Sequence, residues 1–484
     1  MNNEKIPSLH SRYNPVLEAK RYIDSLSLSE KCRYCILIEP GMGYMIAPLR
    51  ERLPSAKIIA LHAGTIPLAE TSLVASCPAA DSQWFAELGI PIQDFLEREI
   101  NDTEAAEIRI LEWRPALAVY GQAYRTLIEE SVEFVKRADA NARTTKAFGK
   151  IWFRNFFRNL KIVKKIVLPK IFSVPVLVTG AGPGLEGTIP LISREFVRKK
   201  FFILAVSSSA AVLEARGIIP DMIISTDGGN WARYHLYECF RNSAFIKNPL
   251  AVSVTAALPS QCGALPVLPI SDGSAWQTVI LKELGIPFII QPMRGTVSAA
   301  ALDLAFGLTK DDIYISGIDL ENRDILSHAR PYSLDRFMED AAEKRNPYYS
   351  QAFKRSGILK AGGSYGIYAA WFEKQKAAYS RRLHSLGGNN PLFGSIGALP
   401  PETADETTVD KKAPAGFTVF EPEKSDNTGQ KALDILIKAL TETPASTQIR
   451  EELKLLLFAD KAETSGAEII DYLRKMAANS ARFF

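Results

Sequence analysis

A glycine-rich turn in the middle of the chain has the residue types of a phosphate-binding cradle. An apolar run at residues 175–179, typical of a buried strand, breaks into this turn, and helix-like sequence follows. The turn consists of Gly180, Ala181, Gly182, Pro183, Gly184 and Leu185. Glycine adopts backbone angles that other residues avoid, so it lets backbone N–H groups approach an anion at the positive end of a helix. The turn therefore predicts a site for a nucleotide or a phosphorylated small molecule.

The spacing of the turn also matches the dinucleotide fingerprint G-x-G-x-x-G, but its context does not fit an NAD site. The three matching glycines are Gly182, Gly184 and Gly187. An NAD site needs an acidic residue about 20 positions later, at the tip of the second strand. The second predicted strand ends instead in Ser207, Ser208 and Ser209. The sequence disfavours a dehydrogenase and leaves two interpretations: a nucleotide-phosphate site, or a turn needed only for packing.

Alternating strand and helix patterns around the turn predict a doubly wound parallel sheet. The strand-type runs in this region are residues 176–178, 202–206, 222–225, 250–254, 288–290 and 313–316. Helical stretches such as 210–216 and 296–306 lie between them. Ligands of such sheets bind outside the carboxyl ends of the strands. The polar residues just past the predicted strand ends, besides the glycine turn, are Ser207, Ser208, Asp227, Gly295, Thr296 and Asp319.

The whole chain is predicted to be α/β, with a Rossmann-like doubly wound central domain, a smaller Rossmann-like N-terminal domain and a helical C-terminal region. The expected boundaries are an N-terminal domain at 1–120, a helical connector at 121–170, the central catalytic domain at 171–332, a helical extension at 333–384, a linker or long loop at 385–430 and a C-terminal helical module at 431–484. The glycine turn of the N-terminal domain carries Glu39, whose carboxylate would repel a phosphate. A scaffolding role is therefore favoured there over a second active site.

Composition places the chain among ordinary globular proteins. Of its 484 residues 47% are hydrophobic and 23% are charged, and the net charge of +4 is too small to argue for nucleic-acid binding. The sequence contains no uninterrupted apolar segment of about 18 residues and no signal-peptide core at its start, so we expect no stable membrane insertion. Five cysteines in so long a chain do not form a disulfide framework. We therefore expect a cytoplasmic protein.

Two local features have both a functional and a structural interpretation. Cys32 and Cys35 have the C-x-x-C spacing of a metal or redox pair, but no second ligand pair follows at a suitable distance, so packing is favoured. Residues 146–170 carry eight Lys or Arg and no acid, with aromatic residues interleaved. Such a helix can bind a membrane surface or an acidic partner. It can equally connect domains with its aromatic face packed, and the second interpretation is favoured.

Several ordered segments together resemble the Maf (motility-associated factor) glycosyltransferases. They are residues 155–159 (Asn-Phe-Phe-Arg-Asn), 178–185 (Val-Thr-Gly-Ala-Gly-Pro-Gly-Leu), 205–213 (Ala-Val-Ser-Ser-Ser-Ala-Ala-Val-Leu), 225–227 (Ser-Thr-Asp), 313–320 (Ile-Tyr-Ile-Ser-Gly-Ile-Asp-Leu) and 327–329 (Ser-His-Ala). The chain departs from the family at Gly184, where serine is usual. The resemblance spans residues 145–335 and implies a core similar to bacterial sialyltransferases. It implies transfer of a nonulosonic acid of the pseudaminic or legionaminic type from a CMP-activated donor to Ser or Thr of flagellin.

The same resemblance suggests roles for the polar residues at the strand ends. The turn from Gly180 to Leu185 would hold the donor phosphate, and Ser207, Ser208 and Asp227 match positions that touch the nucleotide. The last two donor-binding candidates are Gly295 and Thr296. The catalytic candidates are His328, as the base that accepts the acceptor hydroxyl proton, and Asp319, which positions substrate or caps its loop. His235 is the competing base. No metal ligand and no required cofactor is expected.

Two other functions remain open. The core is also similar to the 6-hydroxymethylpterin diphosphokinases of the MptE-like type, which would need Mg²⁺ to hold the ATP phosphates. The second open function is that of a non-catalytic protein that binds flagellin. The sequence leaves open which sugar is moved, which flagellin residues accept it and which oligomeric state the protein adopts.

Overall fold

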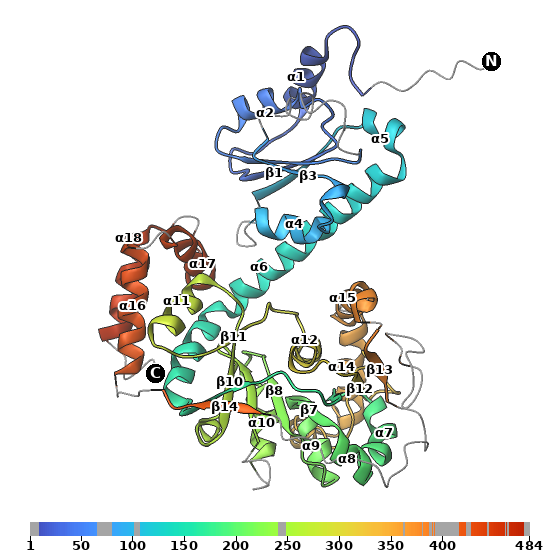
Figure 1. The fold of residues 1–484 in the computed structure, drawn as a ribbon, viewed down its shortest axis with the longest axis vertical. Coiled ribbons are helices and arrows are strands. Elements are labelled where there is room, and N and C mark those ends of the chain that lie inside the picture. The colour runs from blue at the N-terminus through green and yellow to red at the C-terminus, as the bar shows by residue number, and fades with distance from the viewer. Residues whose placement is uncertain are drawn as a thin grey trace, which may run out of the picture. The chain divides into compact units, whose positions relative to one another are not determined.

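The computed structural model describes most of the chain. The described residues are 9–64, 80–100, 107–240, 248–361, 364–379, 381–386, 390, 392, 416–422, 427–442, 445–459, 461 and 464–478. The chain divides into two compact units, Met1–Ala147 and Phe148–Phe484. The division falls inside helix α6 (Gln122–Ile162), so each unit contains part of that helix (Figure 1).

The N-terminal unit contains a four-stranded parallel sheet in the order β3-β2-β1-β4. The strands are β1 (Tyr34–Ile38), β2 (Lys57–Leu61), β3 (Ser82–Trp84) and β4 (Ile108–Glu112). The helices are α1 (Pro15–Ser25), α2 (Ile46–Arg52), α4 (Ile92–Glu99) and α5 (Pro115–Tyr120), with a short 3₁₀ turn at Ala86–Leu88. This strand order is that of the first half of a Rossmann fold.

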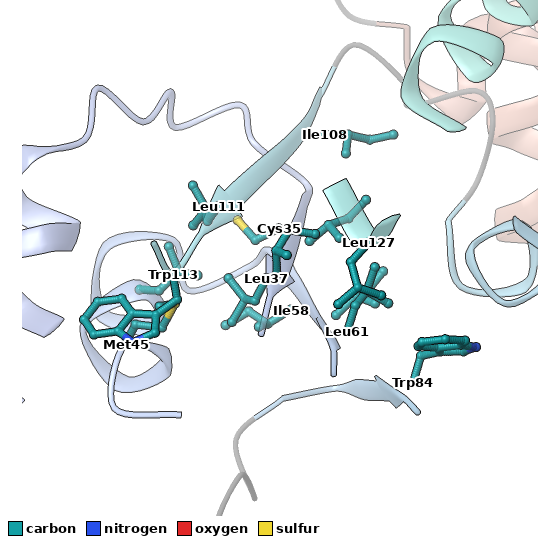
Figure 2. Packing of buried hydrophobic residues seen from close by; sticks show 14 of the residues in the cluster. Cys35, Leu37, Met45, Ile58, Leu61, Trp84, Ile108, Leu111, Trp113 and Leu127 are labelled. Carbon is teal, nitrogen blue, oxygen red and sulfur yellow. The ribbon is translucent and has the colours of Figure 1, made fainter. Parts of the chain in front are cut away.

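The core of the N-terminal unit explains why its two central strands are almost continuously apolar. Cys35 and Leu37 of β1 and Ile58 of β2 are fully buried, and Leu127 of α6 packs into the same cluster (Figure 2). A parallel strand is covered on both faces, so alternation between polar and apolar residues disappears. The predicted small Rossmann-like domain is therefore confirmed in its fold class.

The second unit contains a ten-stranded sheet in the order β13-β12-β6-β7-β8-β9-β10-β5-β14, with β11 paired to β10. Its strands are β5 (Lys165–Pro169), β6 (Val176–Thr179), β7 (Phe202–Val206), β8 (Met222–Ser225), β9 (Leu250–Ser253), β10 (Pro266–Ser271), β11 (Ile289–Ile290), β12 (Ile313–Ser316), β13 (Leu383–Ser385) and β14 (Phe417–Phe420). Every pairing is parallel except that of β14 with β5.

Helices cover both faces of this sheet. They are α7 (Gly184–Ile192), α8 (Glu195–Lys200), α9 (Ala210–Ala215), α10 (Arg233–Cys239), α11 (Ala275–Glu283), α12 (Val297–Leu308), α13 (Asp335–Asp340), α14 (Tyr348–Ala361) and α15 (Ser364–Tyr379), with 3₁₀ turns at Ser207–Ser209 and Ser260–Ala264. On β7, Leu204 packs in the core that contains α12, while Ile203 packs in the core that contains α7 to α10. The doubly wound α/β prediction is confirmed.

Three strands of the sheet come from segments outside the predicted central domain. Strand β5 lies in the predicted connector, β13 spans the boundary between the predicted helical extension and the predicted linker, and β14 lies in that linker at 385–430. The central sheet is thus wider than residues 171–332. These strands are three to five residues long, and each acquires its identity from the neighbour it pairs with rather than from its own sequence.

The C-terminal helices α16 (Thr428–Glu442), α17 (Ser446–Phe458) and α18 (Gly466–Ala478) form one cluster with α11 (Figure 1). The last turns of α6 join that cluster through Phe153, Phe156 and Phe157, which are buried. The basic side chains of Lys150 and Arg154 on the same helix are exposed. This is the arrangement of a packed connecting helix with a solvated basic face. Within the described ranges no helix has both the length and the apolar character needed to cross a bilayer.

Candidate functional site

The glycine turn lies at the point of the central sheet where the strand order reverses. Strands β6 to β10 follow one another along the sheet, and the chain then returns to place β12 on the other side of β6. The turn after β6 is tied to the segment after β12: the Gly180 N–H donates to the Ser316 carbonyl at 2.8 Å, and the Gly182 N–H donates to the Gly317 carbonyl at 2.7 Å. Such a switch point is where open α/β sheets bind their ligands.

The glycines of the turn are needed for the close approach of these two loops. A Cβ on Gly180 would overlap the carbonyl oxygen of Gly317, and a Cβ on Gly182 would lie 2.5 Å from the Asp319 carboxylate. A Cβ on Gly187 would meet nothing within 4 Å. In a dinucleotide fingerprint the third glycine is needed for close packing of helix on strand. The structure therefore gives a packing reason for Gly180 and Gly182 and none for Gly187.

The Asp319 carboxylate occupies the start of α7. Its Oδ2 accepts a hydrogen bond of 2.6 Å from the Gly184 N–H, and the side chain is buried. Burial raises the pKa of Asp319, and the hydrogen bond from Gly184 offsets part of that effect. The Gly184 amide was expected to face a phosphate, and here the protein's own carboxylate takes it. This bond caps the start of α7, and the expected role of Asp319 in positioning substrate stays a prediction.

The loop that carries His328 is fastened to the glycine turn. The Ala329 N–H donates to the Ala181 carbonyl at 2.8 Å, and the Arg330 N–H donates to the Glu186 carboxylate at 2.8 Å. Within the same loop Leu320 and Asp324 adopt positive φ angles of 51° and 57°. Non-glycine residues in that region are strained and persist where the surroundings hold them. The turn therefore positions the predicted base as well as the strand ends.

His328 and the competing base His235 meet around one tyrosine. The His328 ring stacks on Tyr332 with centroids 4.0 Å apart, and its Nδ1 lies 2.8 Å from the Ser327 hydroxyl. His235, on α10, has its ring centroid 5.3 Å from that of Tyr332. Burial lowers the pKa of His328 to about 3 and that of His235 to about 4, and in both the Arg355 guanidinium adds to the effect. Both imidazoles are therefore neutral at neutral pH, and each is a weaker base than an ordinary histidine.

The three serines after β7 differ in how deeply their side chains are buried. Ser209 is buried and donates to the carbonyls of Thr179 and Val206, so it joins β6 to β7. Ser207 is also buried, whereas Ser208 is half-buried. Of the two serines predicted to contact the nucleotide, Ser208 therefore has the more accessible side chain.

Asp227 is exposed at the end of β8, in a loop that one asparagine of α6 holds. Its Oδ1 accepts from the Gly229 N–H at 2.7 Å. The Asn155 amide on α6 donates to the carbonyls of Gly228 and Thr255, both at 3.0 Å. Asn159, one turn later, likewise donates to the loop after β9, at Val254 and Ala256. The Asn-Phe-Phe-Arg-Asn motif thus positions the strand-end loops. Sequence reasoning assigned it no role, although two asparagines four residues apart lie on one helix face.

Gly295 and Thr296 begin α12. The Thr296 hydroxyl oxygen accepts from the Ala299 N–H at 3.0 Å, which caps the helix, and Gly295 has a φ of +73°. A Cβ on Gly295 would lie 3.7 Å from the Tyr368 ring of α15. Burial raises the pKa of Tyr368 and the Asp227 carboxylate raises it further, so the start of α12, α15 and the end of β8 face one region. The expected hydroxyl donor at Thr296 is mainly a helix cap.

The predicted helical extension contributes residues that the sequence did not single out. Arg355 of α14 and Tyr365 of α15 join Tyr332 of the central domain in the histidine cluster, and the Arg355 Nη2 is 3.5 Å from the Tyr332 hydroxyl. A half-buried arginine beside neutral histidines and tyrosines is a set of hydrogen-bond donors suited to an anion. No motif marks these residues, because their spacing along the helices resembles that of ordinary surface positions.

A larger cavity of about 450 Å³ lies on the sheet between β9, β10, α6, α11 and α16. It is lined mainly by apolar side chains such as Leu160, Val252 and Leu281, and none of the predicted site residues lines it. A mostly apolar cavity is a poor site for a phosphorylated acid sugar, because buried charges need partners. The carboxyl ends of the strands therefore remain the candidate site.

Cys32 and Cys35, the C-x-x-C pair singled out in the sequence, are buried with their sulfurs 3.6 Å apart. Across the described residues, no group of three or more His, Cys, Asp or Glu side chains is arranged to hold a metal ion.

Glu39, in the glycine turn of the N-terminal unit, acts as an internal anion. Its carboxylate accepts from the Ala63 N–H at 2.6 Å and lies 3.7 Å from the His62 imidazole. Burial by itself raises the pKa of Glu39, but the contacts with His62 and the backbone amides outweigh it and lower the pKa overall. A negative charge already occupies this turn, in agreement with a scaffolding role.

Comparisons with known proteins bear on the fold and the central domain. Residues 152–324 match the family model described as 6-hydroxymethylpterin diphosphokinase MptE-like. An uncharacterized protein of Treponema pallidum (strain Nichols) is 28% identical over 333 residues, which cover 68% of this chain and 72% of that protein. Among solved structures, a Maf glycosyltransferase from Magnetospirillum magneticum AMB-1 aligns with a TM-score of 0.51 and 12% sequence identity. That alignment covers 98% of this chain and 83% of the other.

The central domain is similar to the MptE-like family, and the fold is similar to that of a Maf glycosyltransferase. Both similarities support the resemblance seen in the sequence. At 12% identity the structural likeness concerns the fold, so the reaction has to be argued from the site.

Proposed function

We propose that the chain is a glycosyltransferase that moves a nonulosonic acid, of the pseudaminic or legionaminic type, from a CMP-activated donor to Ser or Thr of flagellin in the cytoplasm. The observation that carries the proposal is His328: a neutral imidazole fastened to the glycine turn at the switch point of the sheet. A fold similar to that of a Maf glycosyltransferase supports it.

The proposed reaction needs one proton acceptor and no metal. The acceptor hydroxyl oxygen attacks the anomeric carbon of the sugar while the bond from that carbon to the phosphate oxygen breaks. CMP leaves with the electron pair, and His328 takes the hydroxyl proton. The leaving group is a single phosphate monoester, whose charge hydrogen-bond donors at the strand ends can stabilise. His328 would supply the base and Ser208 a hydroxyl donor, whereas the amides of Gly180, Gly182 and Gly184 are already bonded within the protein.

The main alternative is a Mg²⁺-dependent diphosphokinase, which the MptE-like match favours. Such a reaction needs carboxylates free to hold the metal on the ATP phosphates. Asp227 and Asp319 are the carboxylates at this edge, and Asp319 is already bonded to the Gly184 amide. Dependence on Mg²⁺ therefore separates the two enzymes. Release of CMP in the presence of flagellin would eliminate the third possibility, a non-catalytic flagellin-binding protein.

Cytidine nucleotides should bind better than ATP or NAD. The turn has no P-loop lysine, and the second strand lacks the acidic residue that holds the ribose of NAD. Isothermal titration calorimetry with CMP, CTP, ATP and NAD measures this preference. Micromolar NAD binding without any cytidine binding would contradict the proposed donor.

Asp227→Ala should weaken donor binding by about 10–100-fold without unfolding the protein, because a charged hydrogen-bond partner of the ribose is lost. Asp227 is exposed, so its side chain contributes little to packing. Asp340→Ala removes the same charge from an exposed position on α13 and serves as the control. Calorimetry with CMP and a thermal melt of each variant make the comparison. A wild-type affinity in Asp227→Ala would remove that residue from the site.

The cellular test compares flagellin from cells with and without this chain by mass spectrometry. We expect the mass of one or more nonulosonic acid residues on flagellin only when the chain is present. A strain that carries His328→Ala separates catalysis from binding. If the chain only bound flagellin and another enzyme transferred the sugar, this variant would still restore the modification. Identical flagellin masses in all strains would refute the proposed acceptor.

A further inference from the structure

Arg355 is a half-buried cation that has no acidic partner in the parts of the chain the structure describes. Its guanidinium carbon lies 5.5 Å from the centre of the Tyr332 ring, and its one described hydrogen bond is the 3.5 Å contact with the Tyr332 hydroxyl. Arg330, on the adjacent loop, is by contrast paired to Asp335 at 3.4 Å. A partly buried charge without a counter-charge is unfavourable, and an anionic ligand would relieve that cost.

The groups around Arg355 are mostly neutral hydrogen-bond donors. His328 and Tyr332 come from the loop after β12, His235 from α10, Tyr348 from α14 and Tyr365 from α15. The carboxylates that face the cluster are Asp335 of α13, Asp227 after β8 and Asp319 after β12. Asp335 is paired to Arg330 at 3.4 Å, so its charge is partly offset and an anion would be drawn to the arginine.

Electrostatic contacts place Arg355 at the carboxyl edge of the sheet. Burial raises the pKa of Tyr365, and both Arg355 and Asp319 act on that tyrosine. Burial raises the pKa of Tyr332 as well, and Arg355 and Asp227 both act on it. Arg355 therefore acts on the same tyrosines as the carboxylates that follow β8 and β12, where the donor is proposed to bind.

The cavity beside these side chains limits what can enter. It measures about 20 Å³, and the polar residues that border it include Ser327, His328, Tyr332, Asp335 and Arg355. That volume is close to the space of one water molecule. A single oxygen atom of an anion fits there, whereas a sugar ring or a base does not.

We propose that Arg355 binds the anionic group of the donor, a phosphate or carboxylate oxygen, beside Tyr332 and His328. The identity of the ligand rests on the proposed function, but the anion site does not. Arg355 lowers the pKa of His328, so an anion bound to the guanidinium raises it. The base would then become stronger when the donor is present.

The binding test compares charged and uncharged probes on the full-length protein. CMP against cytidine probes the phosphate, and N-acetylneuraminic acid against its methyl ester probes the carboxylate. We expect Arg355→Gln to weaken one charged probe by about 10–100-fold, the usual effect of losing a charged hydrogen bond, and to leave the uncharged probes unchanged. The probe that responds tells which anionic group Arg355 holds. Equal weakening of charged and uncharged probes, or no weakening, would overturn the proposal.

Matched variants separate binding from folding. Arg336→Gln removes the same charge from an exposed position on α13 and should bind all probes as the wild type does. Arg355→Lys keeps the positive charge but lacks the planar guanidinium group, so it should bind the charged probe more tightly than Arg355→Gln does and less tightly than the wild type does. If Arg355→Gln fails to fold, Arg355→Lys still tests the site, because only a specific anion contact distinguishes the two cations.

A spectroscopic readout separates this inference from the proposed function. The chain has five histidines, so ¹³C-labelled imidazole signals can be assigned with single variants. Inorganic phosphate should shift the His328 signal in the wild type but not in Arg355→Gln, even if no cytidine ligand binds. If CMP binds equally to both proteins, the donor assignment stands and Arg355 is not its anion site.

The pH profile of transfer gives a second readout that a structural role would not move. Removal of the Arg355 cation raises the pKa of His328 in the free protein. The acidic limb of kcat/KM, which reports the base in the free enzyme, should therefore shift to higher pH in Arg355→Gln. An unshifted limb would mean that Arg355 does not act on the base.

Discussion

Replacement of His328 by alanine is expected to slow sugar transfer by about 10²–10⁴-fold and to leave donor affinity near the wild-type value. A general base acts on the acceptor hydroxyl in the transition state, whereas CMP lies on the other side of the reacting carbon. In the structure the imidazole is held by stacking on Tyr332 and by the tie between Ala329 and Ala181. Paired measurements of CMP-sugar binding and of transfer to flagellin test the expectation.

His235→Ala is the comparison that identifies the base. The two histidines share Tyr332, but only His328 lies on the loop fastened to the glycine turn. We expect His235→Ala to lose much less activity than His328→Ala. Equal loss of binding and transfer in His328→Ala would instead indicate a structural role, and loss of neither would transfer the assignment to His235 or a carboxylate.

Replacement of Gly180 by alanine is expected to destabilise the second unit by about 3 kcal/mol, at the upper end of the usual cost of overpacking. The new Cβ would overlap the Gly317 carbonyl. Neither backbone can retreat easily, because the Gly180 N–H is bonded to Ser316 and the Gly182 N–H to Gly317. The midpoint of urea denaturation, followed by tryptophan fluorescence, measures the change.

Gly187→Ala is the matched control within the same turn and helix. Its Cβ would meet nothing within 4 Å, and the residue is helical and exposed. Alanine is a better helix former than glycine, so stability should rise by up to about 1 kcal/mol. If both variants lose stability equally, the close contact at Gly180 is not what the glycine is needed for.

The strands that position the site can be predicted from their own sequences, whereas the strands that widen the sheet cannot. Runs such as residues 202–206 are apolar without interruption, which is typical of a strand covered on both faces. Strand β10 contains Pro266 and Pro269 and was not predicted, since proline normally disfavours a central strand. Here β10 pairs with β5 only at residues 266–267 and with β11 only at 270–271 on that side, so Pro269 falls between the two partners.

The features of the site also fall into those that the sequence predicts and those that it does not. The glycine turn, Asp227 and His328 each follow a recognisable strand, and strand ends meet at one edge of a parallel sheet. The bond from Gly184 to Asp319 joins residues 135 positions apart, and no local pattern shows that a carboxylate will take the amide expected to hold a phosphate. Arg355 lies on a helix that looked like an appendage, and only the folded chain brings it to the histidines.

The most direct test of the proposed function is transfer by the purified full-length chain. The chain is mixed with a CMP-nonulosonic acid and unmodified flagellin in the presence of EDTA, and both the flagellin mass and the CMP released are measured. We expect the flagellin mass to rise by whole sugar residues, with one CMP released for each, and with no requirement for Mg²⁺. Unchanged flagellin with or without Mg²⁺, together with Mg²⁺-dependent formation of AMP from ATP and 6-hydroxymethylpterin, would contradict the account and establish the diphosphokinase alternative.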